Sequence, residues 1–453
     1  MGRTLPAFAA APLAAHVSGH FALRPSDEQM ETSVPEVIFE IDRDMKTSMR
    51  NQSVPGHNRW HPDIPPATTI RPGGSYRIEC KDWTDNQVRN DDSSDDIRDM
   101  NIDPCHMLSG PFAIEGVEPG DLLVVDILNI GPFQEQSWGY TGIFAKENGG
   151  GFLTDYSPQA SKAIWDLDGV WTSSRHIPGV RFIGNSHPGL FGCAPSHDLL
   201  AEWNRREQAL IDLNPDRVTG DIQPHDGKIP GAPQVPALAL PPLTSGALLG
   251  TLSGADFDKA AAVACRTIPP REHGGNVDIK DLGVGSRVYM PVFVPGGLFS
   301  IGDLHFAQGD GEITFCGAIE MPGFIDLHFD VIKSGMNRYK TNMPFFKPGR
   351  VGPNYSEFIT FEGISVENGR NYYLNATVAY RQACLNAINY LMPAMDWTFE
   401  QAYLFLGAAP IEGRIGGLVD IPNAAASVSI PLSIFDRNIL PGDTHAGHEL
   451  VAE

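Results

Sequence analysis

The densest group of side chains capable of chemistry lies between Val294 and Met321. In sequence order these side chains are Asp303, His305, Gln308, Asp310, Glu312 and Glu320. Because side chains alternate faces along a strand, Asp303 and His305 are predicted to point the same way. The QGDG segment favours a tight turn, after which a returning strand brings Glu312 back toward His305. Carboxylates and an imidazole in this arrangement suit a divalent cation, whereas the simplest alternative is a hairpin with an acidic turn.

Further candidate residues occur in four other segments. An acidic stretch from Asp85 to Asp103, which includes Asp91 and Asp92, runs directly into His106. It is either a solvated loop or a second part of a cation site. The remaining candidates are Trp60 in a proline-punctuated loop, His187 in a predicted glycine-rich turn, and Asn276 and Asp278 in the segment EHGGNVD.

The sequence lacks the usual motifs of covalent catalysis. It contains no GxSxG elbow and no Gly/Ser-rich run with a lysine, and the P-loop and dinucleotide fingerprints are also missing. Cys193, close to the His187 segment, is the strongest candidate for a thiol nucleophile, although a structural role is favoured for it. What remains is hydrolysis assisted by a metal or a carboxylate, which requires no side-chain nucleophile.

Composition excludes several classes of partner. The 453 residues carry a formal charge of −22, which argues against binding to nucleic acid or to an anionic membrane surface. No run approaches the ~18–20 apolar residues of a membrane span. The six widely spaced cysteines include no CxxC pair, so free thiols in a reducing compartment, and hence a cytoplasmic location, are predicted. A small neutral or cationic substrate is the expected partner.

Hydrophobic patterning predicts a mostly β protein of the α+β type, sandwich-like or barrel-like, with a few helices. Residues 109–130 are predicted to form a hairpin around Pro119-Gly120-Asp121. Helices are predicted after Ser196, over 372–392 with Pro393 as the stop, and after Thr398 with a capping box. Three parts are expected. They are a disordered or targeting extension at 1–29, a main domain at 30–435 whose two possible β lobes cross near 214–251, and a tail at 436–453.

Six blocks in order resemble the acetamidase/formamidase family. They are GHNRWHPDIPP, NDDSSDDI, HMLSGPFAIEGVEPGDLL, HPGLFGCAPS, REHGGNVDIKDL and GDLHFAQGDGEI. The first block and the HPG segment are similar to the formamidase branch in particular. The resemblance implies hydrolysis of a small aliphatic amide, with formamide as the expected substrate. It also implies a β-rich fold, a homo-oligomer, and a divalent metal, with zinc expected and calcium as a further candidate.

The matching motifs assign candidate roles within the main domain, which the resemblance makes the catalytic domain. Asp303, His305, Asp91 and Asp92 are the predicted metal ligands. Glu312, Asp278 and His106 are the predicted catalytic residues, and this division between ligands and proton carriers is our own inference. His187, Trp60 and Asn276 are the predicted substrate-binding residues.

Two alternatives stay open at this point. The first keeps the fold but changes the substrate, giving an acetamidase or a γ-lactamase-like hydrolase of cyclic amides, because a methyl group in a pocket changes discrimination by only ~1–3 kcal/mol. The second is a non-enzymatic β-sandwich module in which the acidic stretch binds calcium through its carboxylate oxygens.

Overall fold

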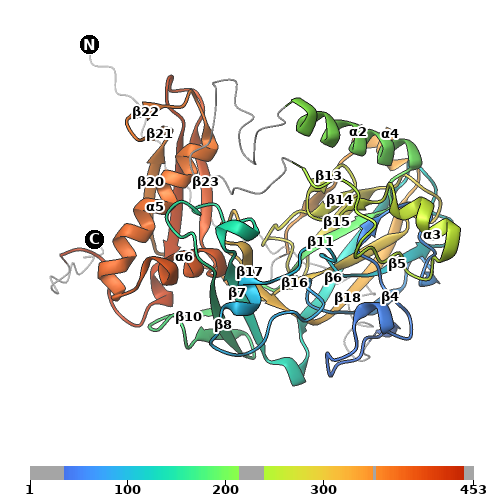
Figure 1. Cartoon of the computed structure of the whole chain (residues 1–453), viewed down its shortest axis with the longest axis horizontal. Helices are drawn as coiled ribbons and strands as arrows, with labels where there is room; N and C mark the ends of the chain where they lie inside the picture. The colour runs from blue at the N-terminus through green and yellow to red at the C-terminus, as the bar shows by residue number, and fades with distance from the viewer. Residues whose placement is uncertain (1–34, 214–238, 350–352, 443–453) are drawn as a thin grey trace, which may run out of the picture. The chain divides into compact units, whose positions relative to one another are not determined.

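Two β-sheets packed face to face dominate the computed structural model, which describes residues 35–213, 239–349 and 353–442 (Figure 1). The first sheet has six strands in the order β1-β4-β18-β6-β15-β19. Their bounds are β1 Glu36–Phe39, β4 Ser75–Cys80, β18 Gly323–Ile332, β6 Leu122–Pro132, β15 Arg287–Pro291 and β19 Phe345–Lys347.

The second sheet has eleven strands and carries most of the candidate residues. Its main path is β10-β9-β8-β7-β17-β16-β11-β14-β13, and β5 joins it by pairing with β16 and with β3. The bounds along this path are β10 Arg181–Ile183, β9 Trp171–Ser174, β8 Ser161–Asp168, β7 Trp138–Ile143, β17 Phe315–Met321, β16 Phe299–His305, β11 His187–Cys193, β14 Gly274–Asn276 and β13 Pro270–Arg271, with β5 at Leu108–Ile114 and β3 at Thr68–Ile70.

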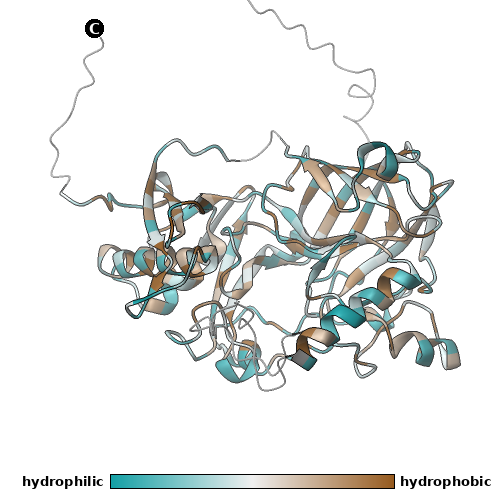
Figure 2. Ribbon diagram, turned by 90° about the horizontal axis from the view of Figure 1, so that it is seen from above, coloured by the Kyte–Doolittle hydropathy of each residue, from teal (hydrophilic) through white to brown (hydrophobic). Residues whose placement is uncertain are grey.

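The two sheets bury a common apolar core. The ring of Phe299 on β16 meets that of Phe329 on β18 with centroids 5.3 Å apart, and Phe39 on β1 meets Phe112 on β5 at 6.0 Å. Figure 2 shows the hydrophobic colouring concentrated along strands and the helices packed on them. Edge-on aromatic contacts of this kind add to the burial of apolar area that holds stacked sheets together. The prediction of a mostly β fold with few helices is confirmed.

The predicted hairpin over residues 109–130 is wrong. Its two strands form, as β5 and β6, but they belong to different sheets. β5 pairs with β16 and β3, while β6 pairs with β15 and β18. The turn at residues 115–121 therefore carries the chain from one sheet to the other, because both strands are buried and each pairs with strands of its own sheet.

A C-terminal layer packs beside the larger sheet. Its three strands run in the order β20-β24-β23, at Phe358–Ile364, Ala425–Pro431 and Glu412–Gly417. Helix α5 (Ala376–Met395) packs on β20 and β24, while α6 (Phe399–Ala408) packs on β17, β7 and β8. The capping box of Thr398 with Gln401 is confirmed. Pro393 does not stop α5, because it lies in the last turn and the helix continues to Met395, where Asp396 caps it in the left-handed region.

The remaining elements are short, apart from α2. They are α1 Asp95–Arg98, α2 His197–Leu213, α3 Gly254–Ala261, α4 Gly335–Tyr339, the strand pairs Arg59–Trp60 with Cys265–Arg266 and Val366–Glu367 with Arg370–Asn371, and 3-10 turns at Met49–Asn51, Gln134–Gln136, Lys146–Asn148 and Leu432–Ile434. Ser196 caps α2 as predicted, since its Oγ accepts a hydrogen bond from Leu199 N at 3.1 Å.

The predicted domain limits stay predictions. Residues 1–29, most of the proposed crossing at 214–251 and most of the tail at 436–453 lie outside the described residues. Within the part of the chain that is described, no helix combines the length and the apolar character that a membrane span requires.

Candidate active site

The β16–β17 hairpin brings the first three site residues together. Register places His305 opposite Glu320, and His305 Nε2 lies 3.2 Å from Glu320 Oε2 and 3.4 Å from Asp303 Oδ1. The predicted shared face of Asp303 and His305 is therefore confirmed. The returning strand delivers Glu320, whereas Glu312 lies in the connection between the two strands.

Two loops complete the cluster. Asp278 follows β14, Glu312 precedes β17, and with His305 they form a second group whose ligand atoms lie within 4.8 Å of one another. Asp278, Asp303 and Glu312 all have positive φ, at 47°, 55° and 45°. Non-glycine residues adopt this left-handed region at a cost, and such residues gather at functional sites where the surrounding structure holds them. We call Asp278, Asp303, His305, Glu312 and Glu320 the acid–histidine cluster.

Gly189 on β11 makes room for this cluster. A Cβ placed there would lie 2.5 Å from His305 Cε1, 2.6 Å from Asp303 Oδ2 and 2.8 Å from Asp278 Oδ1. These distances are below any normal contact, so a side chain at this position would displace the carboxylates. The HPGLFGC segment was predicted as a turn but forms a fully buried strand, and its glycine serves close approach.

Hydrogen bonds behind His305 fix its ring. His305 Nδ1 lies 3.1 Å from Gln308 Oε1 and 3.3 Å from His187 Nε2, while Gln308 Nε2 donates to Asp278 O at 2.6 Å. His187 Nδ1 in turn lies 2.7 Å from Asn185 O. With both rings neutral, Nδ1 of His305 carries its proton and Nε2 faces the carboxylates. Outer hydrogen bonds of this kind are typical of metal-binding histidines. His187 thus lies behind the cluster.

Four ligand atoms of the cluster are unsatisfied. Asp278 Oδ1, Asp303 Oδ1, His305 Nε2 and Glu320 Oε2 are buried and make no hydrogen bond among the described residues, although His305 Nε2 lies within ion-pair distance of the Asp303 and Glu320 oxygens. Buried polar atoms are normally paired, so four orphans that face one another point to a missing positive species. Three carboxylates and an imidazole form a donor set that divalent metals accept. The residues present therefore fit a divalent cation.

The electrostatics agree with this donor set. Desolvation raises the pKa of Asp278 to about 7 and, with the charge of Asp278, raises that of Glu312 well above its usual range. Burial likewise raises the pKa of Glu320. Burial opposes charge on His305, but Glu320 and Asp303 outweigh it and raise the pKa of His305. Burial would also raise the pKa of Asp303, yet His305 lowers it to about 2. The groups whose pKa is raised therefore lie where a bound cation would neutralise the negative charge.

A cavity of about 580 Å³ opens onto one side of the cluster, and we call it the front cavity. Three candidate residues reach its wall: Glu312, His106 and Asn276, whose Oδ1 is unpartnered among the described residues. The His106 backbone N–H donates to Thr267 Oγ1 at 2.6 Å, its ring lies 5.0 Å from that of Trp83, and burial lowers its pKa. Apolar side chains make most of the rest of the wall: Trp83, Ile102, Phe144, Leu210, Leu240, Ile268, Pro269 and Phe315.

The C-terminal layer anchors the loop that carries Glu312. Asp310 Oδ1 pairs with Lys280 Nζ at 2.9 Å, and Asp310 Oδ2 accepts from Gly413 N at 2.8 Å. The Tyr380 hydroxyl of α5 donates to Asp310 O. Because Lys280 lies two residues after Asp278, the ion pair also ties together the two loops of the cluster. Asp310 is therefore engaged by a cation already.

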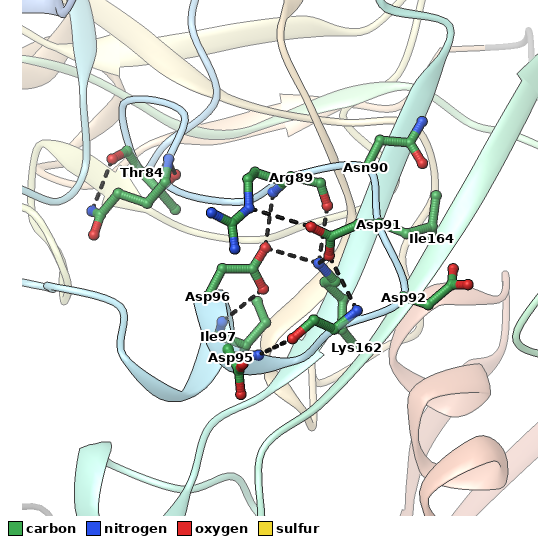
Figure 3. Close-up of polar contacts among 12 residues, drawn as sticks. Thr84, Arg89, Asn90, Asp91, Asp92, Asp95, Asp96, Ile97, Lys162 and Ile164 are labelled. Carbon is green, nitrogen blue, oxygen red and sulfur yellow. Dashed lines mark hydrogen bonds and ion pairs between the residues drawn. The ribbon is translucent and has the colours of Figure 1, made fainter.

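Three sequence candidates reach neither the cluster nor the front cavity. Asp91 and Asp92 pair with basic side chains instead. Asp91 Oδ1 lies 3.0 Å from Lys162 Nζ (Figure 3). Asp92 Oδ1 lies 2.8 Å from Arg175 Nε. Neither belongs to a described group of three potential ligands. Trp60 is buried in the core, with its ring 4.3 Å from that of His273, and it does not line the front cavity.

Cys193 is unsuited to act as a nucleophile. It is fully buried, and burial raises its pKa to about 12, so its thiol stays protonated. All six cysteines are free and buried, as the sequence predicted.

Sequence reasoning missed three contributors. Glu320 was in the opening segment, but only strand register shows that it faces His305. Gln308 positions His305 and the Asp278 backbone through hydrogen bonds, which its residue type alone does not predict. Gly189 contributes by lacking a side chain, and the only available signal was its place in the HPG motif.

Comparison with known proteins identifies the family of the chain. The profile of the Acetamidase/Formamidase family matches residues 42–437. The chain is 59% identical over 390 residues to an acetamidase of Mycolicibacterium smegmatis, covering 84% of this chain and 91% of that protein. It is 52% identical over 405 residues to a formamidase of Methylophilus methylotrophus, covering 89% and 95%. The solved structure of a gamma lactamase from Delftia acidovorans superposes with a TM-score of 0.84 at 50% identity, covering 90% of this chain and 95% of that one. The chain belongs to the acetamidase/formamidase family.

Proposed function

We propose that this protein hydrolyses formamide to formate and ammonia, using water activated within the acid–histidine cluster. The observation that carries the proposal is the set of four unsatisfied ligand atoms in a buried cluster beside a cavity. Membership of the family and the 52% identical formamidase support the reaction type, which is cleavage of a linear amide C–N bond.

Asp303, His305 and Glu320 would hold a divalent cation, with Asp278 at its edge. Zinc is the proposed ion, because an imidazole with carboxylates is among its usual ligand sets. When bound, the cation acidifies water toward a pKa of about 7 and polarises the amide carbonyl. Calcium is a less suitable ion here, since it takes oxygen ligands only.

The chain's own residues supply binding and proton transfer. Glu312 lines the front cavity and belongs to the group with Asp278 and His305, so it is placed to move a proton from water toward the leaving nitrogen. Asn276 and His106 present polar atoms to the same cavity and would orient the amide. Gln308 and His187 keep the ring of His305 in position. Trp83 and Phe144 line the cavity with apolar rings against which the substrate would pack.

A second candidate function follows from the front cavity. A volume of about 580 Å³ with mainly apolar walls is larger than formamide requires. Acetamide or a small lactam would use this space better, and the acetamidase at 59% identity and the structurally similar gamma lactamase have such activities in their names. Specificity constants for formamide, acetamide and a small lactam would rank the three substrates.

The decisive experiment measures ammonia release from formamide before and after removal of metal. Purified protein should release ammonia, lose this activity with a chelator, and regain it with zinc. Metal analysis should find the ion, and its removal should lower the melting temperature because the ion binds the folded state. Full activity without any metal would reject the metal role, while absence of ammonia release from all three amides would reject the function.

We further propose that the protein acts in the cytoplasm as a homo-oligomer. The six free, buried cysteines support a reducing compartment. Light scattering coupled to size-exclusion chromatography tests the assembly, and a mass equal to the 49.2 kDa chain would contradict it.

A further inference from the structure

A second cavity, of about 210 Å³, meets the acid–histidine cluster at Glu320, and we call it the rear cavity. Glu320 lines this cavity and is 3% exposed. Its Oε2 has no hydrogen-bond partner among the described residues and lies 3.2 Å from His305 Nε2. Glu320 is therefore shared between the cluster and the wall of the rear cavity, whereas Glu312 and His106 line the front cavity.

A fixed second carboxylate lines the rear cavity. Asp82 is 3% exposed, and its Oδ2 accepts hydrogen bonds from Tyr140 OH at 2.7 Å and Thr84 Oγ1 at 2.6 Å. Its Oδ1 accepts from Asn86 N at 2.5 Å. These bonds hold the carboxylate in place, so the cavity keeps its acidic wall without any rearrangement.

The rest of the wall is suited to a small cation. Asn90 and Gln136 line it with amide oxygens that each accept one hydrogen bond already, at 3.0 Å from Arg175 Nη2 and 3.0 Å from Trp138 Nε1, and that each keep a second lone pair. The aromatic side chains of Trp138 and Tyr140 form another part of the wall. Arg89 is the cation among the described lining residues, and its Nε faces Asp91 Oδ2 at 3.3 Å. Glu320 faces His305 in the cluster and Arg89 faces Asp91, so the carboxylate without a basic partner among the described lining residues is Asp82. Its negative charge favours a cation and repels a carboxylate.

This inference rests on the proposed function, because it concerns the two products of that hydrolysis. Hydrolysis of a primary amide yields a carboxylate anion and, at neutral pH, an ammonium cation. We propose that the rear cavity binds the ammonium product and releases it separately from the carboxylate. Ammonium has only donors and needs several acceptors, which Glu320, Asp82 and the amide oxygens provide. The cavity has room for the ion with several waters, each of which occupies ~30 Å³ in the liquid.

Two matched substitutions test the assignment. Asn90→Lys places a fixed positive charge at the rear cavity, where Asn90 is exposed, and Asn148→Lys does the same at the front cavity. Ammonium chloride serves as the product inhibitor of formamide hydrolysis at neutral pH and constant ionic strength. We expect Asn90→Lys to raise the inhibition constant of ammonium about fivefold, which corresponds to ~1 kcal/mol of Coulomb repulsion. Asn148→Lys should leave that constant unchanged.

The opposite pattern would overturn the proposal, as would an equal effect of both substitutions or an absence of ammonium inhibition in the natural protein. Gln136→Lys, which also faces the rear cavity, replaces Asn90→Lys if that variant does not fold. Failure of the natural protein to release ammonia from formamide would refute the proposed function. Ammonia release with the wrong inhibition pattern would refute only the role of the rear cavity.

Discussion

Two regions rich in carboxylates were candidates for a cation site, and the structure treats them in opposite ways. In the acidic loop, residues 85–103, six aspartates have basic partners within hydrogen-bond range. These aspartates are Asp85, Asp91, Asp92, Asp95, Asp96 and Asp99. Figure 3 shows Lys162 reaching both Asp91 and Asp96. The acid–histidine cluster has no lysine or arginine partner among the described residues, and four of its ligand atoms make no hydrogen bond there.

The number of carboxylates in a region therefore does not identify a cation site. What matters is whether the protein supplies its own positive charge. A buried carboxylate must be paired, protonated or bound to a metal, because an isolated charge loses too much hydration. The acidic loop uses lysine and arginine, while the cluster has only His305 to oppose four carboxylates.

The largest expected effect comes from His305→Ala in the cluster. This change removes the nitrogen shared by both groups of ligand atoms. We expect kcat/KM for formamide to fall by roughly 10³-fold, on the order of 4 kcal/mol of transition-state stabilisation. Bound metal measured on the same preparation should also fall. Retained activity and metal content would remove the cluster from its assigned role.

Lys162→Met tests the other side of the comparison. Lys162 is nearly fully buried against Asp96, at 2.8 Å, and its loss leaves a buried carboxylate that keeps two backbone N–H donors but has no cation beside it. We expect the free energy of unfolding to drop by about 3–5 kcal/mol, measured by urea titration, with kcat per folded molecule unchanged.

The same variant offers a sharper readout. Without Lys162 the acidic loop becomes deficient in positive charge, so added calcium should stabilise the variant more than the natural protein. The double variant with Asp96→Asn should recover part of the lost stability. An equal stabilisation of both proteins by calcium would contradict the proposed difference between the acidic loop and the acid–histidine cluster.

Gly189→Ala tests how closely the cluster is packed. The new methyl group would overlap His305, Asp303 and Asp278, shifting them by a fraction of an ångström. Misplacement on this scale should cost about 10–100-fold in kcat/KM. Gly131→Ala is the matched control, because its Cβ would lie 3.9 Å from the Phe324 ring, an ordinary contact. Similar kinetics for both variants would show that the cluster tolerates the displacement.

Asp92→Asn should have the smallest effect. Its side chain is 76% exposed, and its pair with Arg175 is solvent-screened. We expect stability to change by no more than about 0.5 kcal/mol, with metal content and activity unchanged. A loss of metal would instead support the ligand role that we inferred for Asp92 from the sequence.

Local features of the fold were predictable from sequence. Ser196 and the Thr398–Gln401 box start their helices as predicted, because capping depends on neighbours three residues apart. Strand partners were not predictable, and the failed hairpin shows why. Alternation in residues 109–130 identifies two buried strands but contains no information on which sheet receives each one.

For the candidate site, the types of the reactive side chains and the class of chemistry could be predicted from the sequence alone. Asp303 and His305 lie two apart on a strand, so a period of two placed them on one face, and missing nucleophile motifs favoured hydrolysis assisted by a metal or a carboxylate over covalent routes. The motif blocks tied Asp278 and Glu312 to the same site.

The tertiary structure was needed to show which carboxylates face one another and which are paired with lysine or arginine. Glu320 enters the site through strand register, and Gly189 admits the cluster by having no side chain. Asp91 and Asp92 are drawn to Lys162 and Arg175, partners distant in sequence. The physical reason is that charge pairing acts over a few ångströms in space, whereas sequence records separation along the chain.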